Sequence, residues 1–133
     1  MKLIIRDTDY AVRALCFIAK SKKNRVPVSW LIRELNIPGP FLRRILQVLN
    51  QKEILNSYKG QGGGFSLAKP EEEISLIDLM KIFQGPIKLN ECLFKKKICP
   101  NIKVCKLKKK IDKIEKRVLS ELRGITLAYL LKK

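Results

Sequence analysis

The sequence predicts a mainly helical fold, a winged helix-turn-helix with a small β-hairpin wing and a long C-terminal dimerisation helix. Two short helices separated by a tight turn are expected within residues 29–50, and a glycine-rich hairpin follows them directly. An amphipathic segment then runs from Lys106 to about Arg123. A hairpin placed directly after the second helix of a helix-turn-helix is the arrangement of a wing, so these three features together indicate the fold.

The first helix is expected over residues 9–20, where apolar side chains recur at helical spacing. Thr8 or Asp9 can cap this helix with a side-chain oxygen. Cys16 lies in the apolar stripe, and we interpret it as a core residue because a free cysteine packs like a small hydrophobe. The residues that define the inward face are Ala11, Leu15, Ile18 and Ala19.

A helix-turn-helix pattern follows. Residues 26–28 could form a short edge strand, and a second helix is expected over residues 29–35. The Asn-Ile-Pro sequence at residues 36–38 breaks that helix. Pro40 then opens a third helix, at a position where its missing N–H is harmless, and this helix continues to about Asn50.

The third helix has a polar face suited to reading DNA. Arginine can bind guanine through two hydrogen bonds, and glutamine can bind adenine in the same way. The alternative is an ordinary solvated face, since nearly every surface helix has one. The candidate DNA contacts on this helix are Pro40, Arg43, Arg44 and Gln47, with Gln51 on the same side.

The wing is expected over residues 54–68, with a glycine-rich tip at residues 59–64. Glycine accepts positive φ and lets the backbone come close to phosphates or to a groove. A phosphate-binding P-loop is the competing interpretation, but the tip lacks Gly-Lys-Ser/Thr and no helix follows at once. The candidate DNA contacts in the wing are Lys59, Gln61, Gly62 and Gly63.

Three further helices complete the chain. Ser75 and Asp78 match a capping box that opens a helix through Phe83, which the Gln-Gly-Pro sequence at residues 84–86 ends. Thr126 is expected to cap a short last helix. The long helix from Lys106 to about Arg123 has an apolar seam that needs a partner helix, so we expect a homodimer. That seam consists of Leu107, Ile111, Ile114, Val118, Leu122 and Ile125.

Three of the four cysteines, Cys92, Cys99 and Cys105, lie in the loop before the long helix. In a reducing cytosol, clustered cysteines are more often metal ligands or redox sensors than disulfides. Thiolates bind iron–sulfur clusters and zinc alike, and the neighbouring lysines lower thiol pKa values. An iron–sulfur cluster is our first hypothesis. A thiol or disulfide switch, a zinc site and inert cysteines are the alternatives.

The charge favours a nucleic-acid partner. The 133 residues include 29 Lys and Arg against 12 Asp and Glu, for a net charge of +17, and histidine is absent. A chain this basic meets nucleic acid more often than a membrane surface or an anionic protein. No apolar run is long enough for a transmembrane helix and no signal peptide is recognisable, so we expect a cytoplasmic protein without a membrane partner. No nucleophile–base pair can be identified, so no catalytic residue is predicted.

Taken together in this order, several motifs make the chain resemble the winged-helix regulator family that contains the iron–sulfur regulator IscR and the nitric-oxide sensor NsrR. The resemblance covers essentially the whole chain and implies a dimeric DNA-binding transcription factor. In many members the cysteine loop carries an iron–sulfur cluster, [2Fe–2S] or [4Fe–4S], and other members lack it. Besides the three cysteines, the motifs are Thr8–Leu15, Ile37–Leu42, Gly60–Ala68, Ile74–Asp78, Gly85-Pro86 and Ile125–Ala128.

The chain departs from the family pattern in two places. Its cysteines are spaced C-x6-C-x5-C, whereas family cluster-binders commonly have C-x5-C-x5-C. The histidine that IscR-like members use after the third cysteine is absent. NsrR-like members use an aspartate near the N-terminus, supplied by the partner subunit, and Asp9 stands in the matching place. Asp7 is a weaker candidate, and a helix N-cap is the alternative role for Asp9.

These observations predict a winged helix-turn-helix domain over residues 1–86, a cysteine cluster loop over residues 87–105, and a dimerisation helix with a short last helix over residues 106–133. A ligand-sensing transcription factor, a constitutive DNA-binding module with vestigial cysteines, and a basic RNA-binding protein are the three function classes. The wing and the helix-turn-helix favour duplex DNA, because the deep major groove of RNA is hard for side chains to read.

Overall fold

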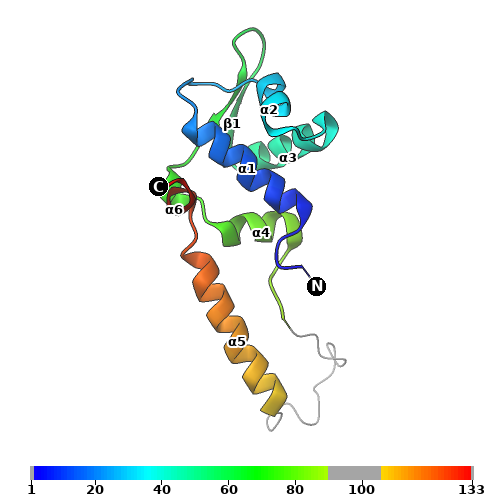
Figure 1. The fold of residues 1–133 in the computed structure, drawn as a ribbon, viewed down its shortest axis with the longest axis vertical. Coiled ribbons are helices and arrows are strands. Elements are labelled where there is room, and N and C mark those ends of the chain that lie inside the picture. The colour runs from blue at the N-terminus through cyan, green and yellow to red at the C-terminus, as the bar shows by residue number, and fades with distance from the viewer. Residues whose placement is uncertain (1, 90–105, 133) are drawn as a thin grey trace.

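The computed structural model describes residues 2–89 and 106–132, and it has the mainly helical winged-helix architecture with a two-stranded antiparallel hairpin (Figure 1). In Figure 1 the hairpin stands at one end of a compact head, and α5 projects away from the other end. The elements, in chain order, are α1 (Arg6–Lys20), α2 (Val28–Leu35), α3 (Gly39–Gln51), β1 (Leu55–Tyr58), β2 (Gly64–Leu67), the 3-10 turn η1 (Glu71–Glu73), α4 (Leu76–Gln84), α5 (Lys106–Arg123) and α6 (Leu127–Leu131).

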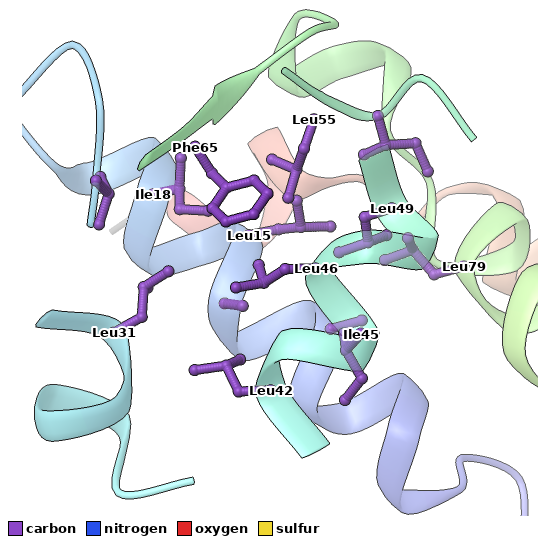
Figure 2. Packing of buried hydrophobic residues seen from close by; sticks show 14 of the residues in the cluster. Leu15, Ile18, Leu31, Leu42, Ile45, Leu46, Leu49, Leu55, Phe65 and Leu79 are labelled. Atoms are coloured by element: carbon purple, nitrogen blue, oxygen red, sulfur yellow. The ribbon is translucent and has the colours of Figure 1, made fainter. Parts of the chain in front are cut away.

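One apolar core fixes the helix-turn-helix and the wing to α1. Figure 2 shows Leu15 of α1, Leu46 of α3 and Phe65 of β2 lying together in this core. Burying one such side chain stabilises the fold by about 1.5–3 kcal/mol. These buried contacts therefore set the position of α3 relative to the hairpin. Leu127 of α6 is buried in the same core, which makes the C-terminal helix part of the head.

The hairpin pairs Leu55 with Leu67 and Tyr58 with Gly64. Val26 joins it through two backbone hydrogen bonds to Phe65, both 2.9 Å long. The strand expected over residues 26–28 is therefore wrong and reduces to this single bridge. Pro27 has no N–H to continue the pairing, and Val28 already begins α2.

The start of α1 differs from the sequence-based expectation. The helix begins at Arg6, and its N-cap is Ile5, which makes no side-chain capping bond. Thr8 and Asp9 lie inside the first turn, so the prediction that either caps the helix is wrong. The physical reason is a distant side chain: Gln84 accepts hydrogen bonds from the Ile5 N–H and the Thr8 hydroxyl.

The predicted helix starts and ends near the C-terminal half are confirmed. Ser75 Oγ accepts from the Asp78 N–H at 3.2 Å at the start of α4, and Gly85 ends that helix with φ +81°. Thr126 Oγ1 accepts from the Tyr129 N–H at 3.1 Å at the start of α6. Each of these signals depends only on residues next to the helix end, which is why the sequence predicts them well.

The apolar seam of α5 divides into two parts. Leu122 is buried in a second core with Leu76, Ile77 and Met80 of α4, and Val118 and Ile125 pack against it. The expectation that the whole seam faces a partner helix is wrong for this half, because α4 of the same chain covers it. At the other end Leu107 is 69% exposed and Ile114 is 39% exposed. Within residues 2–89 and 106–132, no helix combines the length and apolarity needed to cross a bilayer.

Candidate functional site

The outward face of α3 has the composition expected from the helical wheel. Leu42, Ile45, Leu46 and Leu49 are fully buried on the opposite face, which fixes the rotation of the helix. The side chains left exposed in one group are Pro40, Arg43, Arg44, Gln47 and Gln51. The structure therefore brings the four predicted contact residues of α3 together on one surface.

Arg44 is held by the first turn of α1. Its Nη2 lies 3.0 Å from Asp7 Oδ2, in an ion pair between residues 37 positions apart. The Arg44 guanidinium also lies 5.6 Å from the centroid of the Phe41 ring, and the Arg6 guanidinium lies 4.6 Å from the same ring. The sequence alone indicates Asp7 only as a weak ligand candidate and does not predict this contact with α3.

Arg43 has a different environment. It makes no ion pair with any of the residues that the structure describes, and a Cβ atom on Gly39 would lie 3.1 Å from its Nη1. Consecutive residues of a helix point about 100° apart, so Arg43 and Arg44 lie on the two sides of the exposed face. Gln47 follows both by one turn and lies between them. The two arginines are thus not equivalent, which the sequence alone does not show.

The wing tip is a backbone-rich surface with one basic side chain. Lys59, Gln61 and Gly62 are exposed, and the tip turn is closed by the Gly63 N–H, which donates to the Gly60 carbonyl oxygen at 3.0 Å. A Cβ atom on Gly63 would lie 2.4 Å from the Tyr58 carbonyl oxygen. No larger residue fits there, so the glycine is required by the turn itself.

Arg25 is a cation of the wing that sequence analysis missed. Its guanidinium lies 3.9 Å from the centroid of the Tyr58 ring, next to the tip. The bridge between Val26 and Phe65 brings this residue, which precedes α2 in the chain, to the tip end of the hairpin, where Tyr58 pairs with Gly64. Its exposed position and the neighbouring Lys59 make the wing more basic than its own sequence indicates.

Asp9 lies on the first turn of α1 with its side chain 45% exposed. Its carboxylate forms an ion pair with Arg13 Nε of the same helix at 2.9 Å. Asp9 also lines a shallow surface hollow of about 480 Å³ beside Lys2 and Tyr10. The oxygen atoms of Asp9 can therefore be approached from outside the chain, which a ligand supplied to a second subunit requires.

The predicted cluster ligands Cys92, Cys99 and Cys105 lie outside the described residues. The structure shows the residues on either side of the segment that contains them. The Leu89 N–H donates to Glu115 Oε1 at 3.0 Å, and Lys106 begins α5. Among residues 2–89 and 106–132, no three Cys, Asp or Glu side chains come together as a metal site. The assignment of these three cysteines as cluster ligands therefore stays a prediction.

Cys16 is not a suitable ligand. It is half-buried against the main core, and burial raises the pKa of its thiol, with Glu71 acting in the same direction and Lys20 against it. A thiolate is the form that binds iron, so a thiol held protonated in an apolar setting disfavours ligation. The interpretation of Cys16 as a core residue agrees with this position.

Comparisons with known proteins agree with the fold and the motifs. The Rrf2 family model, described as an iron-dependent transcriptional regulator, matches residues 4–133. An Aquifex aeolicus protein described as a candidate HTH-type transcriptional regulator is 29% identical over 132 residues, covering 97% of this chain and 92% of that protein. The HTH-type transcriptional regulator NsrR of Oceanobacillus iheyensis is 31% identical over 127 residues, covering 94% of this chain and 86% of that one.

Among solved structures, the global cysteine regulator CymR of B. subtilis superposes with a TM-score of 0.80. The alignment covers 98% of this chain and 97% of that chain, at 21% sequence identity. At this identity the likeness establishes the fold.

Proposed function

Because the chain belongs to the Rrf2 family of iron-dependent transcriptional regulators, we propose that it binds double-stranded operator DNA as a homodimer in the cytoplasm. We propose further that a group held by its cysteines senses redox state, iron–sulfur status or nitric oxide and alters that binding. The observation that carries the proposal is the family match over residues 4–133, which includes the helix-turn-helix, the wing and the cysteine segment. The family is one of transcriptional regulators rather than enzymes.

The exposed face of α3 supports a role in the major groove. The guanidinium groups of Arg43 and Arg44 can each bind guanine, and the amide of Gln47 can bind adenine. Pro40 lies at the start of α3, the part of a recognition helix that approaches the base edges. The basic, glycine-rich tip at residues 59–63 supports a role on the phosphate backbone, where contacts fix the register of the protein on DNA.

The uncovered part of α5 supports dimer formation. Leu107 and Ile114 expose apolar surface on a helix that projects from the head, and a second copy of the same helix would cover it (Figure 1). A two-fold dimer places its two recognition helices about one DNA turn, roughly 34 Å, apart. The operator is then expected to be approximately palindromic.

The donor set suits an iron–sulfur cluster. Cys92, Cys99 and Cys105 would supply three soft thiolates, and Asp9 of the partner subunit would supply the fourth ligand. When bound, such a cluster supplies iron that reacts with oxygen or nitric oxide. A carboxylate is a harder ligand than a thiolate, so the Asp9 position is the labile one. The Asp9 carboxylate pairs with Arg13 through Oδ2, so a bond to iron would use its other oxygen or replace this ion pair.

A thiol switch is the second candidate. The structural similarity to CymR, a global cysteine regulator, supports this candidate. Cys92, Cys99 and Cys105 would then serve as the reactive thiols. A cofactor-free regulator is the remaining alternative within the family.

Purification without oxygen distinguishes these candidates. An iron–sulfur protein has a visible absorption spectrum and contains iron and sulfide in comparable amounts, whereas a thiol switch contains neither. Replacing any one of Cys92, Cys99 and Cys105 by alanine should abolish the cluster, and Asp9→Ala should alter its spectrum or lifetime. Wild-type protein without iron or sulfide, even after reconstitution, would leave the cofactor-free or thiol-switch regulator as the function.

DNA binding is tested by salt titration on duplexes that the wild-type protein selects from a randomised pool. If a dimer neutralises roughly 6–10 phosphates, affinity should fall by about three to five orders of magnitude between about 50 and 200 mM salt. Arg43→Ala should reduce discrimination between selected and random duplexes, and Lys59→Ala should weaken both equally. A nearly flat salt response would contradict the proposed DNA surface.

A further inference from the structure

We propose that Asp7 determines DNA specificity by positioning the guanidinium of Arg44 on the exposed face of α3. The inference rests on the proposed DNA-binding function and adds to it an acidic residue from a different helix. It starts from the 3.0 Å ion pair between Asp7 Oδ2 and Arg44 Nη2. An acidic side chain beside a DNA-binding surface is unexpected on simple electrostatic grounds, so its presence needs a reason.

Fold stability does not supply that reason. The side chain of Arg44 remains 55% exposed and that of Asp7 26% exposed in the ion pair. Ion pairs exposed to this degree contribute little to the free energy of folding, because water and salt screen them. Asp7 also lies near the positive end of the α1 dipole, but Asp9 occupies the same turn and supplies the same favourable charge.

Orientation of Arg44 does supply a reason. A guanidinium is planar and presents several N–H donors, so an ion pair through one nitrogen leaves other donors available to a base. Phe41 lies beside the same guanidinium and gives it a second support. A side chain that is already ordered loses less conformational entropy on binding, which strengthens contacts that need a fixed plane, such as the paired hydrogen bonds to guanine.

The negative charge of Asp7 also acts against non-specific binding. A carboxylate close to the duplex repels the phosphates of every sequence equally. A base contact made by the oriented Arg44 compensates for this repulsion on the right sequence alone. Asp7 therefore lowers affinity for random DNA more than affinity for the operator, which is the definition of a specificity element.

The support under Asp7 is rigid enough for this role. Thr8, the next residue, is fully buried, and its hydroxyl donates to Gln84 Oε1 at 2.7 Å. The Ile5 N–H donates to the same oxygen at 3.1 Å. These bonds fix the first turn of α1 to the end of α4, so Asp7 approaches α3 from a held position.

The test compares Asp7→Asn with wild type on two probes, a duplex selected from a randomised pool by the wild-type protein and a scrambled duplex of the same composition. Asp7→Asn should bind the scrambled duplex more tightly, and the ratio of the two affinities should fall by about fivefold or more, the lower end expected for one base contact. Asp112→Asn removes an equal charge from α5 and should leave the ratio unchanged. Thermal unfolding of each variant checks that the fold is retained.

Two further variants separate positioning from charge alone. In an Arg44→Ala background, Asp7→Asn should no longer change the ratio. Asp7→Glu keeps the charge but moves the carboxylate, so it should lower the ratio without tightening binding to the scrambled duplex. An unchanged ratio in Asp7→Asn, or an equal change with and without Arg44, overturns the inference while the proposed function stands. A wild-type protein that selects no duplex overturns both.

Discussion

Thr8 Oγ1 donates a 2.7 Å hydrogen bond to Gln84 Oε1, which ties the first turn of α1 to the last residue of α4 across 76 positions of sequence. Gln84 Nε2 in turn donates to the Leu3 carbonyl oxygen at 3.0 Å. One carboxamide thus replaces the side-chain cap that α1 lacks. It also anchors α1 at the point where the chain leaves α4 toward the cysteine segment.

Gln84→Ala should lower the free energy of unfolding by about 1–3 kcal/mol, because the buried Thr8 hydroxyl loses its acceptor. Thr8→Val removes the donor with little change of shape and should cost less, about 0.5–1.5 kcal/mol. Urea unfolding of the two variants measures both values. Gln51→Ala, at an exposed position of α3, is the matched control and should stay within about 0.5 kcal/mol of wild type. Equal midpoints for all three variants would show that the carboxamide does not hold the helix.

The elements that sequence analysis predicted correctly are those whose signals are local. The outward face of α3 follows from helical spacing, the wing follows from alternation around a glycine tip, and the caps at Ser75 and Thr126 involve residues three positions apart. In each case the residues that decide the structure are neighbours in the chain. Fold class and the candidate DNA surface could therefore be predicted without coordinates.

The parts that sequence analysis missed depend on contacts between distant residues. The sequence predicts a start of α1 that is too late, because its anchor, Gln84, is the last residue of a different helix. The pair of Asp7 with Arg44 and the stacking of Arg25 on Tyr58 likewise join separate elements. No periodic pattern marks such pairs, since each depends on how the elements pack.

Gly64→Ala should destabilise the wing strongly. Gly64 has φ +146°, and a Cβ atom there would lie 2.4 Å from the Val26 carbonyl oxygen. The new side chain would force apart the bridge that joins Val26 to the hairpin. We therefore expect the free energy of unfolding to fall by about 2 kcal/mol or more, which is more than backbone strain at a positive φ alone would cost. Gly60→Ala, where φ is +83° and no atom lies within 4 Å of the added Cβ, should show only that backbone strain. Urea unfolding compares the two, and a smaller loss in Gly64→Ala than in Gly60→Ala would contradict the prediction.

Arg25→Ala should weaken binding to all duplexes to a similar extent. The guanidinium lies over the Tyr58 ring beside the wing tip. It therefore belongs to the wing, which is expected to contact phosphates, and not to α3, the helix expected to read bases. The slope of log affinity against log salt concentration should decrease by about one, the change expected for one phosphate contact. Arg117→Ala removes the same charge from α5 and should leave the slope unchanged. A selective loss of operator binding in Arg25→Ala would instead assign this residue to base reading.

The two parts of the α5 seam should respond differently to a charged substitution. Ile114 is 39% exposed, so Ile114→Glu removes apolar surface available to a second copy without disturbing the chain's own packing. Leu122 is buried against α4, so Leu122→Glu places a carboxylate in an apolar core and should unfold the second core in any oligomeric state. In sedimentation, wild type and the exposed control Lys113→Glu should be dimers at tens of micromolar, and Ile114→Glu should be a folded monomer. Wild type that sediments as a monomer, or Ile114→Glu that stays dimeric, would place the dimer contact elsewhere on the molecule.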